Sequence, residues 1–243
     1  MIDRLSIRSR PPGRPINHQW WGKLLFMHWR VPEAVLRPLL PERLTLDMHD
    51  GAAWISLVPF TMWGIRHPRL PALPLLRRSH ELNVRTYVHL DGVPGVWFLS
   101  LDAANPFLVA GGRLLFGLPY FLARMSLREE GSRIHYRSRR THPGAPAAEF
   151  SAVWEVGASL VAPEPESLDF FLTERYCLYS ARGGRLYRSR IQHEPWPLAG
   201  AELLGGEHRE LFTSHGLPAP EEAPLLHAAE RPLHVEIWPL ERV

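Results

Sequence analysis

Four turn dipeptides divide the chain into hairpins, and this feature constrains the fold more than any other. Each dipeptide contains glycine and lies between runs rich in β-branched and aromatic residues. Glycine, and aspartate beside it, adopt the positive backbone φ angles that tight hairpin turns need. The four turns are Asp50-Gly51, Asp91-Gly92, Glu130-Gly131 and Gly183-Gly184, with Pro94-Gly95 expected to lengthen the second turn. Four hairpins predict a largely antiparallel sheet.

Few helices accompany these strands. Residues 105–116 and 167–176 are predicted as helices, with Ser167 capping the second. A strand is expected at 24–29, followed by a short helix beginning near Pro32. The 243 residues, 45% of them hydrophobic, are enough for one core. The prediction is a single α+β domain over residues 1–243, built on a strongly bent antiparallel sheet or β-barrel.

Charge and length patterns exclude several partners. The net charge is only +3, the arginines are spread along the chain, and no nucleic-acid motif is present, so no nucleic acid partner is expected. No apolar run approaches the roughly 18 residues that a membrane helix needs, and the first residues lack a signal-peptide core. Cys177 is the only cysteine, which rules out an intramolecular disulfide. We therefore expect a cytoplasmic protein with no membrane partner.

The segment "ELNVRTYV" (81–88) alternates two kinds of side chain. Glu81, Asn83 and Arg85 occupy one face of the predicted strand, and aliphatic residues occupy the other. A solvated outer face and the polar lining of a cavity explain this pattern equally well. If the face is inward, Ser100 of the partner strand is expected beside it. The hairpin would then present an acid, an amide, a base and a hydroxyl to a small ligand.

Other polar residues extend this candidate pocket. His28, on the first predicted strand, would meet the Glu81 face if both strands line the same cavity. Arg140 alternates with exposed arginines over 133–140 and is placed inward, as a second cation for an anionic ligand. The thirteen histidines form no short ligand motif, and no phosphate-binding glycine loop occurs. No metal and no cofactor are predicted.

Several blocks of sequence resemble a known family. They run in order along nearly the whole chain and include "LLFMHWRVP", "WISLVPFTM", "ELNVRTYV", "PGVWFLSLDA", "GLPYFLARMS" and "PLLHAAERPLHVEIWPLERV". The chain is similar to the YqjF-like bacterial proteins, a domain-of-unknown-function family within the acetoacetate decarboxylase-like superfamily. This resemblance implies a compact α+β fold around a β-barrel with an internal cavity. It brings no established activity.

The resemblance also bears on chemistry. The superfamily's named enzyme carries a lysine pair after a Gly-aromatic-Pro turn, and one of these amines forms a Schiff base. The matching stretch here is Gly117-Leu118-Pro119, followed by Tyr120 and Phe121, so both amines are missing. Glu81 matches a cavity glutamate of that enzyme, which favours the inward face. Lys23, the only lysine, is interpreted as a surface residue rather than a substitute nucleophile.

Two classes of function remain open, beside a closed core that holds no ligand at all. The first is a binding protein whose polar cavity holds a small carboxylate or carbonyl ligand without chemistry. The second is an enzyme, lyase-like or hydrolase-like, acting on such a compound. In that case Arg85 would clamp an anion, Glu81 would act as acid or base, and Tyr120 would donate a hydrogen bond. Exposed strand edges and the habit of the superfamily also suggest a homo-oligomer.

Overall fold

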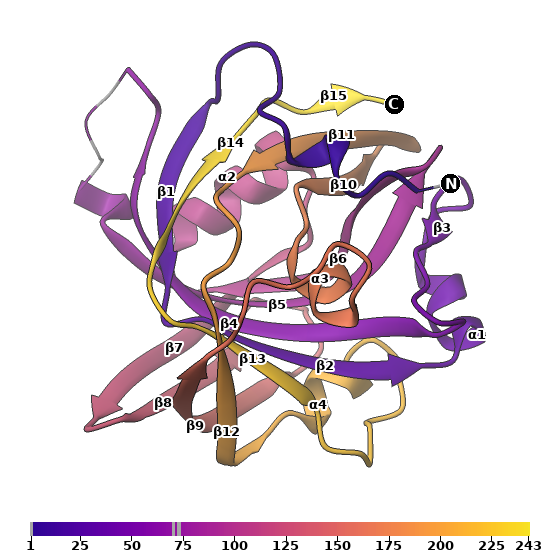
Figure 1. Ribbon diagram of the computed structural model, residues 1–243. Coiled ribbons are helices and arrows are strands. Elements are labelled where there is room, and N and C mark those ends of the chain that lie inside the picture. The colour runs from indigo at the N-terminus through magenta and orange to yellow at the C-terminus, as the bar shows by residue number, and fades with distance from the viewer. Residues whose placement is uncertain (1, 70, 72–73) are drawn as a thin grey trace.

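The computed structural model describes residues 2–69, 71 and 74–243. Within them, fifteen strands form one mixed, mainly antiparallel sheet with a few short helices (Figure 1). The strands are β1 (Asn17–Gly22), β2 (Leu25–Val31), β3 (Thr45–Leu46), β4 (Ala53–Arg66), β5 (Arg78–Leu90), β6 (Val93–Ala103), β7 (Tyr120–Glu130), β8 (Arg133–Arg140), β9 (Glu149–Ser159), β10 (Cys177–Arg182), β11 (Arg185–Gln192), β12 (Leu198–Glu207), β13 (Leu225–Ala229), β14 (Leu233–Ile237) and β15 (Glu241–Arg242). The helices are α1 (Glu33–Leu36), α2 (Pro106–Phe116), α3 (Leu168–Thr173) and α4 (Arg209–Thr213). The α+β class and the antiparallel character predicted from the sequence are confirmed.

Cross-pairings close the sheet into two rings of strands. β1 pairs with both β14 and β4, so the first ring runs β1, β14, β11, β10, β6, β5, β4. The second ring runs β6, β7, β8, β9, β12, β13, β2, β4, β5. The two rings therefore share β4, β5 and β6. Only the β10–β6 and β6–β7 pairs are parallel among the described strands.

The shared strands are buried on both faces because each face turns into a different ring. On β5, Glu81 and Asn83 point into the first ring, while Leu82 and Val84 join the hydrophobic core of the second. Glu81 is only 3% exposed and Val84 is 0% exposed. This double burial explains why alternation alone left the orientation of the strand open.

Three of the four predicted hairpins are confirmed. β5 and β6 meet at Asp91-Gly92, β7 and β8 at Gly131, and β10 and β11 at Gly183-Gly184. Both residues of the first turn have positive φ, 51° and 82°, as a tight two-residue turn requires. Leu90 pairs directly with Val93, so Pro94-Gly95 belongs to β6 and does not lengthen the turn.

The predicted hairpin at Asp50-Gly51 is wrong, because the turn forms but the segments on its two sides do not pair as strands. Only the isolated pair His49 and Ala52 bridges it. The preceding strand β3 pairs instead with β5, through Thr45 and Leu46. Buried Asp47 accepts a hydrogen bond from Arg175 Nη1 at 2.6 Å, and its backbone amide donates to the Tyr87 carbonyl of β5 at 2.9 Å.

The two longer helices begin where the sequence predicts. Asn105 caps α2 by accepting a hydrogen bond from the Phe107 amide at 2.9 Å, and Gly117 ends it with a φ of 63°. Ser167 caps α3 through the Phe170 amide. α3 ends at Thr173, however, three residues before the predicted end, because the following residues leave helical geometry.

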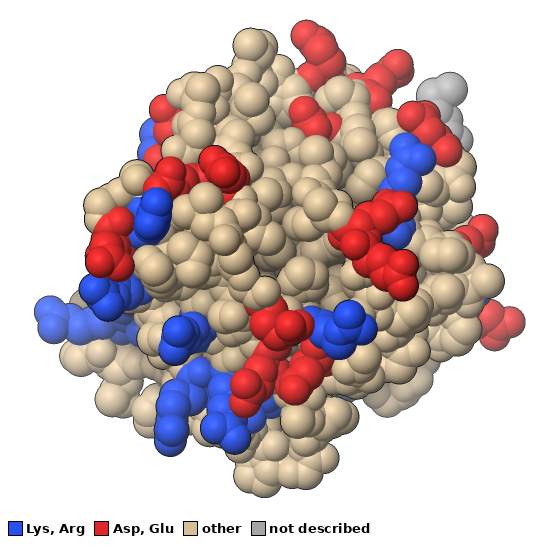
Figure 2. Space-filling model, turned by 90° about the horizontal axis from the view of Figure 1, so that it is seen from below, with Lys and Arg blue, Asp and Glu red and all other residues tan. Residues whose placement is uncertain are grey.

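The surface carries charges of both signs. Figure 2 shows acidic and basic side chains interspersed on one face of the molecule, several of them side by side, around an uncharged central area. On β8, Arg133 and Arg139 are exposed and pair with Glu155 and Glu149. Across the described residues, the helices are all too short or too polar to cross a bilayer.

Candidate functional site

A pocket of about 330 Å³ is lined by strands of the first ring and by α2. Its polar lining comes from neighbouring strands: Asn17 and Gln19 on β1, Glu81 and Asn83 on β5, and Tyr120 at the start of β7. Its apolar lining comes mainly from α2, β4 and β6, including Phe107, Leu108, Leu115, Phe116, Met62, Ile65, Phe98 and Leu101. The pocket is thus a mostly apolar chamber with one polar wall.

Glu81 and Tyr120 form the central contact of that wall. The Tyr120 hydroxyl donates a hydrogen bond to Glu81 Oε2 at 2.9 Å. β6 brings them together, because Ala103 pairs with Glu81 on one side and Leu101 pairs with Tyr120 on the other. No residue of the described chain hydrogen-bonds to Glu81 Oε1, which leaves this oxygen for a ligand.

Burial changes the proton affinity of both groups. Loss of water raises the pKa of Glu81 from 4.5 to about 8; the Tyr120 hydrogen bond lowers it in part, and nearby Asp102 raises it further. Burial, followed by the neighbouring Glu81 charge, raises the pKa of Tyr120 well above its usual value. At neutral pH, therefore, Glu81 is mainly a neutral carboxylic acid and Tyr120 a neutral phenol.

Two neighbours fix this pair in place. The Tyr136 hydroxyl donates to the Glu81 backbone carbonyl at 2.8 Å, which anchors β5 at that residue. Gly112 of α2 lies directly against the Tyr120 ring, where a Cβ atom would overlap the ring carbons. A glycine at this position lets the helix approach closely enough to press the tyrosine toward Glu81.

Asn83 is the third predicted residue in the pocket wall. It lies two residues along β5 from Glu81 and is 7% exposed. Its Oδ1 atom is buried without a hydrogen-bond partner among the described residues. A buried amide oxygen without a partner is costly, and a ligand donor placed there would satisfy it.

Arg85 and His28 do not line this pocket, contrary to the sequence prediction. Arg85 Nη2 donates to the Leu172 carbonyl at 3.1 Å, with its guanidinium over the Phe26 ring. His28 Nδ1 contacts Ser56 Oγ at 2.7 Å in a separate buried cluster. Arg85 lies four residues along β5 from Glu81, next to Leu172 of α3, and its Nε has no hydrogen-bond partner among the described residues.

Ser100 and Arg140 lie on the opposite side of the sheet, and their predicted place beside Glu81 is wrong. A β-bulge shifts the register, so that Val84 faces Ser100 and Arg85 faces Phe98. Ser100 Oγ consequently contacts His215 Nε2 at 3.0 Å. Arg140 is inward, as expected, but its Nε donates to buried Asp102 at 2.9 Å. Both residues face the second ring.

Charge is distributed unevenly around the pocket. Among the described residues, its lining includes no lysine or arginine. The sole lysine, Lys23, lies outside the pocket, where its Nζ pairs with Glu129 at 2.6 Å, and its side chain is 41% exposed. The pocket therefore provides hydrogen-bond donors and apolar surface, and no fixed cation.

Some pocket residues escaped the sequence analysis. Asn17 and Gln19 follow the period-two alternation of "NHQWWG", which was a readable signal for an inward polar edge. Gly112 had no readable signal, because its role depends on the distance between α2 and Tyr120, which no local pattern encodes.

The fold defines the class of protein. Two solved structures superpose over almost the whole chain: the enduracididine biosynthesis enzyme MppR complexed with pyruvate, and an acetoacetate decarboxylase. The first is 14% identical, with a TM-score of 0.63 and coverage of 95% of this chain and 91% of that one. The second is 17% identical, with a TM-score of 0.61 and coverage of 98% and 91%. The protein has the acetoacetate decarboxylase-like fold.

Within that class, the chain belongs to the DUF2071 family of uncharacterized conserved proteins, whose model matches residues 18–232. Its relative YqjF from Bacillus subtilis (strain 168), also uncharacterized, is 41% identical over 234 residues, which cover 96% of this chain and 95% of YqjF. The family resemblance read from the sequence blocks is confirmed.

Proposed function

We propose that the protein binds a small, uncharged carbonyl compound with an apolar body in the pocket beneath α2. The observation that carries this proposal is the Glu81–Tyr120 pair. A carboxylic acid whose pKa is about 8 holds its proton at neutral pH, and its free oxygen opens on the pocket. A neutral acid donates a hydrogen bond, and a carbonyl oxygen accepts one.

The lining favours a carbonyl over a carboxylate. A carboxylate would enter a pocket whose described lining has no lysine or arginine, and it would face any Glu81 that had lost its proton. Burying an unpaired anion is expensive, whereas a ketone or ester oxygen needs only a donor. Arg85, the cation expected to hold an anion, lies outside the pocket lining, where its Nη2 donates to the Leu172 carbonyl.

The apolar walls support a ligand with a hydrocarbon portion. Phe107, Leu108, Leu115 and Phe116 of α2 line the pocket, and Phe107 and Leu115 are also 57% and 71% exposed. Burying apolar ligand surface against them contributes roughly 25 cal/mol per Å². The polar wall would then fix the orientation of the ligand, as in most small-molecule sites.

The neighbouring structures add a chemical parallel. MppR, an enzyme of the same fold, was solved with pyruvate, a compound with both a ketone and a carboxylate, of which the ketone alone matches the ligand proposed for this chain. In this chain, Tyr120 occupies the position where the superfamily resemblance places a lysine. A phenol cannot form a Schiff base, so the carbonyl would be held by hydrogen bonds alone.

Matched neutral and anionic probes test this proposal. Isothermal titration calorimetry with methyl pyruvate and pyruvate, and with ethyl acetoacetate and acetoacetate, compares each ester with its acid. We expect each ester to bind at least about tenfold more tightly than its anion at pH 7, a difference of about 1.4 kcal/mol. Equal or stronger binding of the anions would overturn the choice of an uncharged ligand.

Variants locate the binding. Tyr120→Phe and Glu81→Ala are each expected to weaken ester binding about tenfold or more. Glu81→Ala removes the donor to the ligand, and Tyr120→Phe removes the hydrogen bond that orients this donor. Ser100→Ala is the matched control: it also removes a buried polar group from the same hairpin, but on the face turned to the second ring. Equal losses in Ser100→Ala would indicate a general structural effect and contradict the pocket assignment.

An enzyme of acid–base type is the second candidate. The raised pKa of Glu81 favours it, since a general acid works best when its pKa lies near the working pH. Glu81 would protonate a carbonyl or leaving-group oxygen, with Tyr120 orienting it. Turnover of an ester or keto compound with a rate that falls above pH 8, and is lost in Glu81→Gln, would support this alternative over simple binding.

A further inference from the structure

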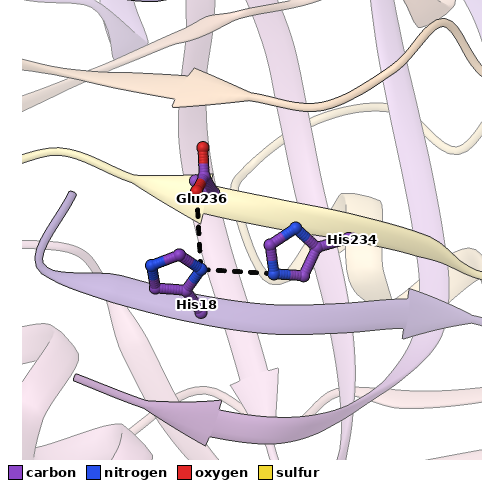
Figure 3. A group of neighbouring side chains, drawn as sticks. All are labelled: His18, His234 and Glu236. Atoms are coloured by element: carbon purple, nitrogen blue, oxygen red, sulfur yellow. Dashed lines mark hydrogen bonds and ion pairs between the residues drawn. The ribbon is translucent and has the colours of Figure 1, made fainter. Parts of the chain in front are cut away.

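A second group of side chains lies on the outer surface of the first ring, back to back with the pocket. β1 sends Asn17 and Gln19 inward, so the alternating residue His18 points outward. On the paired strand β14, His234 and Glu236 point to the same outer face. Figure 3 shows these three side chains converging across the two strands.

Strand register produces this convergence. His18 lies directly opposite Glu236, and His234 lies one diagonal step away, opposite Trp20. Diagonal and directly opposed residues on one face are close enough for long side chains to meet. His18 Nδ1 is 3.2 Å from His234 Nε2 and 3.5 Å from Glu236 Oε1.

The three atoms are spaced as metal ligands are. Zinc bonds of about 2.0–2.1 Å to nitrogen and oxygen, at tetrahedral angles, place neighbouring ligand atoms about 3.3–3.4 Å apart. All three ligand atoms here lie within 4.8 Å of one another. Two imidazoles and one carboxylate are a common ligand set for zinc and related transition metals.

The surroundings suit a bound ion with an open position. An open cleft of about 480 Å³ borders His234 and Glu236 and has room for water or an anion as a fourth ligand. Arg10 holds both oxygens of the Glu236 carboxylate, Nη1 on Oε2 and Nη2 on Oε1 at 3.2 Å, so it orients the carboxylate and an ion would share Oε1 with it. Arg66 lies opposite His18 in the register of β1 and β4. Arg10 and Arg66 therefore place positive charge near the site, which limits its affinity for a cation.

We propose that His18, His234 and Glu236 bind one divalent transition-metal ion, with zinc as the best fit, on the face of the first ring opposite the pocket. The ion would link β1 to β14 by side-chain bonds where these strands close the ring. This site is independent of the carbonyl pocket, because its ligands lie on the other side of the same two strands.

The test uses full-length protein treated with a chelator and then dialysed. Titration with ZnCl₂ by calorimetry is expected to show one equivalent bound with a micromolar or tighter dissociation constant. Co²⁺ is expected to produce the d–d absorption bands of a tetrahedral site, and Zn²⁺ to raise the unfolding temperature. Absence of binding heat and of Co²⁺ bands in the wild-type protein would overturn the proposal.

Single substitutions assign the ligands. His18→Ala, His234→Ala and Glu236→Gln are each expected to weaken Zn²⁺ binding at least tenfold. The matched control is His135→Ala, because His135 Nε2 also lies 3.5 Å from a carboxylate, that of Glu130, but belongs to no three-residue group in the described chain. Glu236→Gln keeps a partner for Arg10 and so guards against simple misfolding. Binding that survives in the His18→Ala, His234→Ala double variant would contradict the assignment.

Discussion

At the residue scale, the carboxyl of Glu81 carries most of the chemistry of the pocket. Its oxygens have unequal roles: Oε2 accepts the Tyr120 hydrogen bond, and Oε1 is left for a ligand. Burial dominates its proton affinity, since the Tyr120 hydrogen bond opposes the upward shift without cancelling it. A side chain that was expected to act as an acid or base is therefore mainly a neutral acid at pH 7.

This raised pKa predicts a pH dependence of stability. Native Glu81, with a pKa of about 8, keeps a proton that the unfolded chain releases near pH 4.5. The native state thus binds more protons between these values, and the free energy of unfolding falls as pH rises. The slope is at most about 1.4 kcal/mol per pH unit for one group.

Urea unfolding at pH 7.0–8.0 measures this slope, because Asp102, with a pKa of about 6, has already lost its proton there. The buried histidines, whose native pKa values are lowered, add an opposing slope near pH 7, because their unfolded pKa of about 6.5 leaves part of a proton bound there. This slope is common to wild type and Glu81→Gln, so the difference between the two proteins isolates Glu81. We expect stability to fall more with rising pH in wild type than in Glu81→Gln, and identical slopes in the two proteins would contradict the raised pKa of Glu81.

At the scale of elements, the helix α2 controls the pocket through one close contact. Gly112 packs against the Tyr120 ring, and the adjacent Gly111 faces open pocket space. Both glycines weaken the helix intrinsically, since glycine is roughly 0.5–1 kcal/mol less favourable than alanine in a helix interior. Only Gly112 offsets this loss of helix stability, because it packs against the Tyr120 ring.

Replacement by alanine is expected to change the free energy of unfolding in opposite directions at the two glycines. In Gly112→Ala, the new methyl group would overlap the Tyr120 ring, so the ring must move away from Glu81. We expect the free energy of unfolding to fall by about 1–3 kcal/mol, and ester binding to weaken as in Tyr120→Phe. In Gly111→Ala, nothing lies within 4 Å of the added Cβ, and stability should rise by up to about 1 kcal/mol. Chemical denaturation of both variants, alongside the calorimetric binding assay, checks this contrast; equal stability changes would contradict the packing role.

At the scale of the whole molecule, the distribution of amines bears on Schiff-base chemistry. A Schiff base needs a deprotonated amine in the cavity, usually produced by burial or by a second cation. The chain has one lysine, and Lys23 pairs with Glu129 outside the pocket. The fold contains a pocket, but Tyr120, at the position where the superfamily resemblance places an amine, carries a phenol.

We therefore predict no acetoacetate decarboxylation and no covalent adduct when the protein is treated with acetoacetate and borohydride. Intact-protein mass spectrometry measures the adduct, and carbon dioxide release measures turnover. Lys23→Ala serves as the comparison and should behave like the wild-type protein. An adduct on Lys23, lost together with carbon dioxide release in Lys23→Ala, would mean that this lysine acts as a relocated nucleophile.

Much of the fold was readable because it depends on local backbone chemistry. Asp91-Gly92 and Gly183-Gly184 form the predicted turns, since these residues adopt the positive φ angles that tight turns need. Asn105 and Ser167 cap the predicted helices through their own side-chain oxygens. The absence of lysine at Tyr120 and Phe121 is likewise a property of the sequence alone.

The tertiary structure decided which faces and residues meet. β5 is buried on both sides because two rings share it, and the alternation of Glu81 and Leu82 does not reveal this. One extra residue in β6 turned Ser100 to the second ring, and α3 took Arg85 as its partner. His18 and His234, 216 positions apart, meet only because β1 pairs with β14. Turns and caps are set by neighbours in the chain, whereas cavities and clusters depend on pairings between distant strands, for which a single sequence carries no local signal.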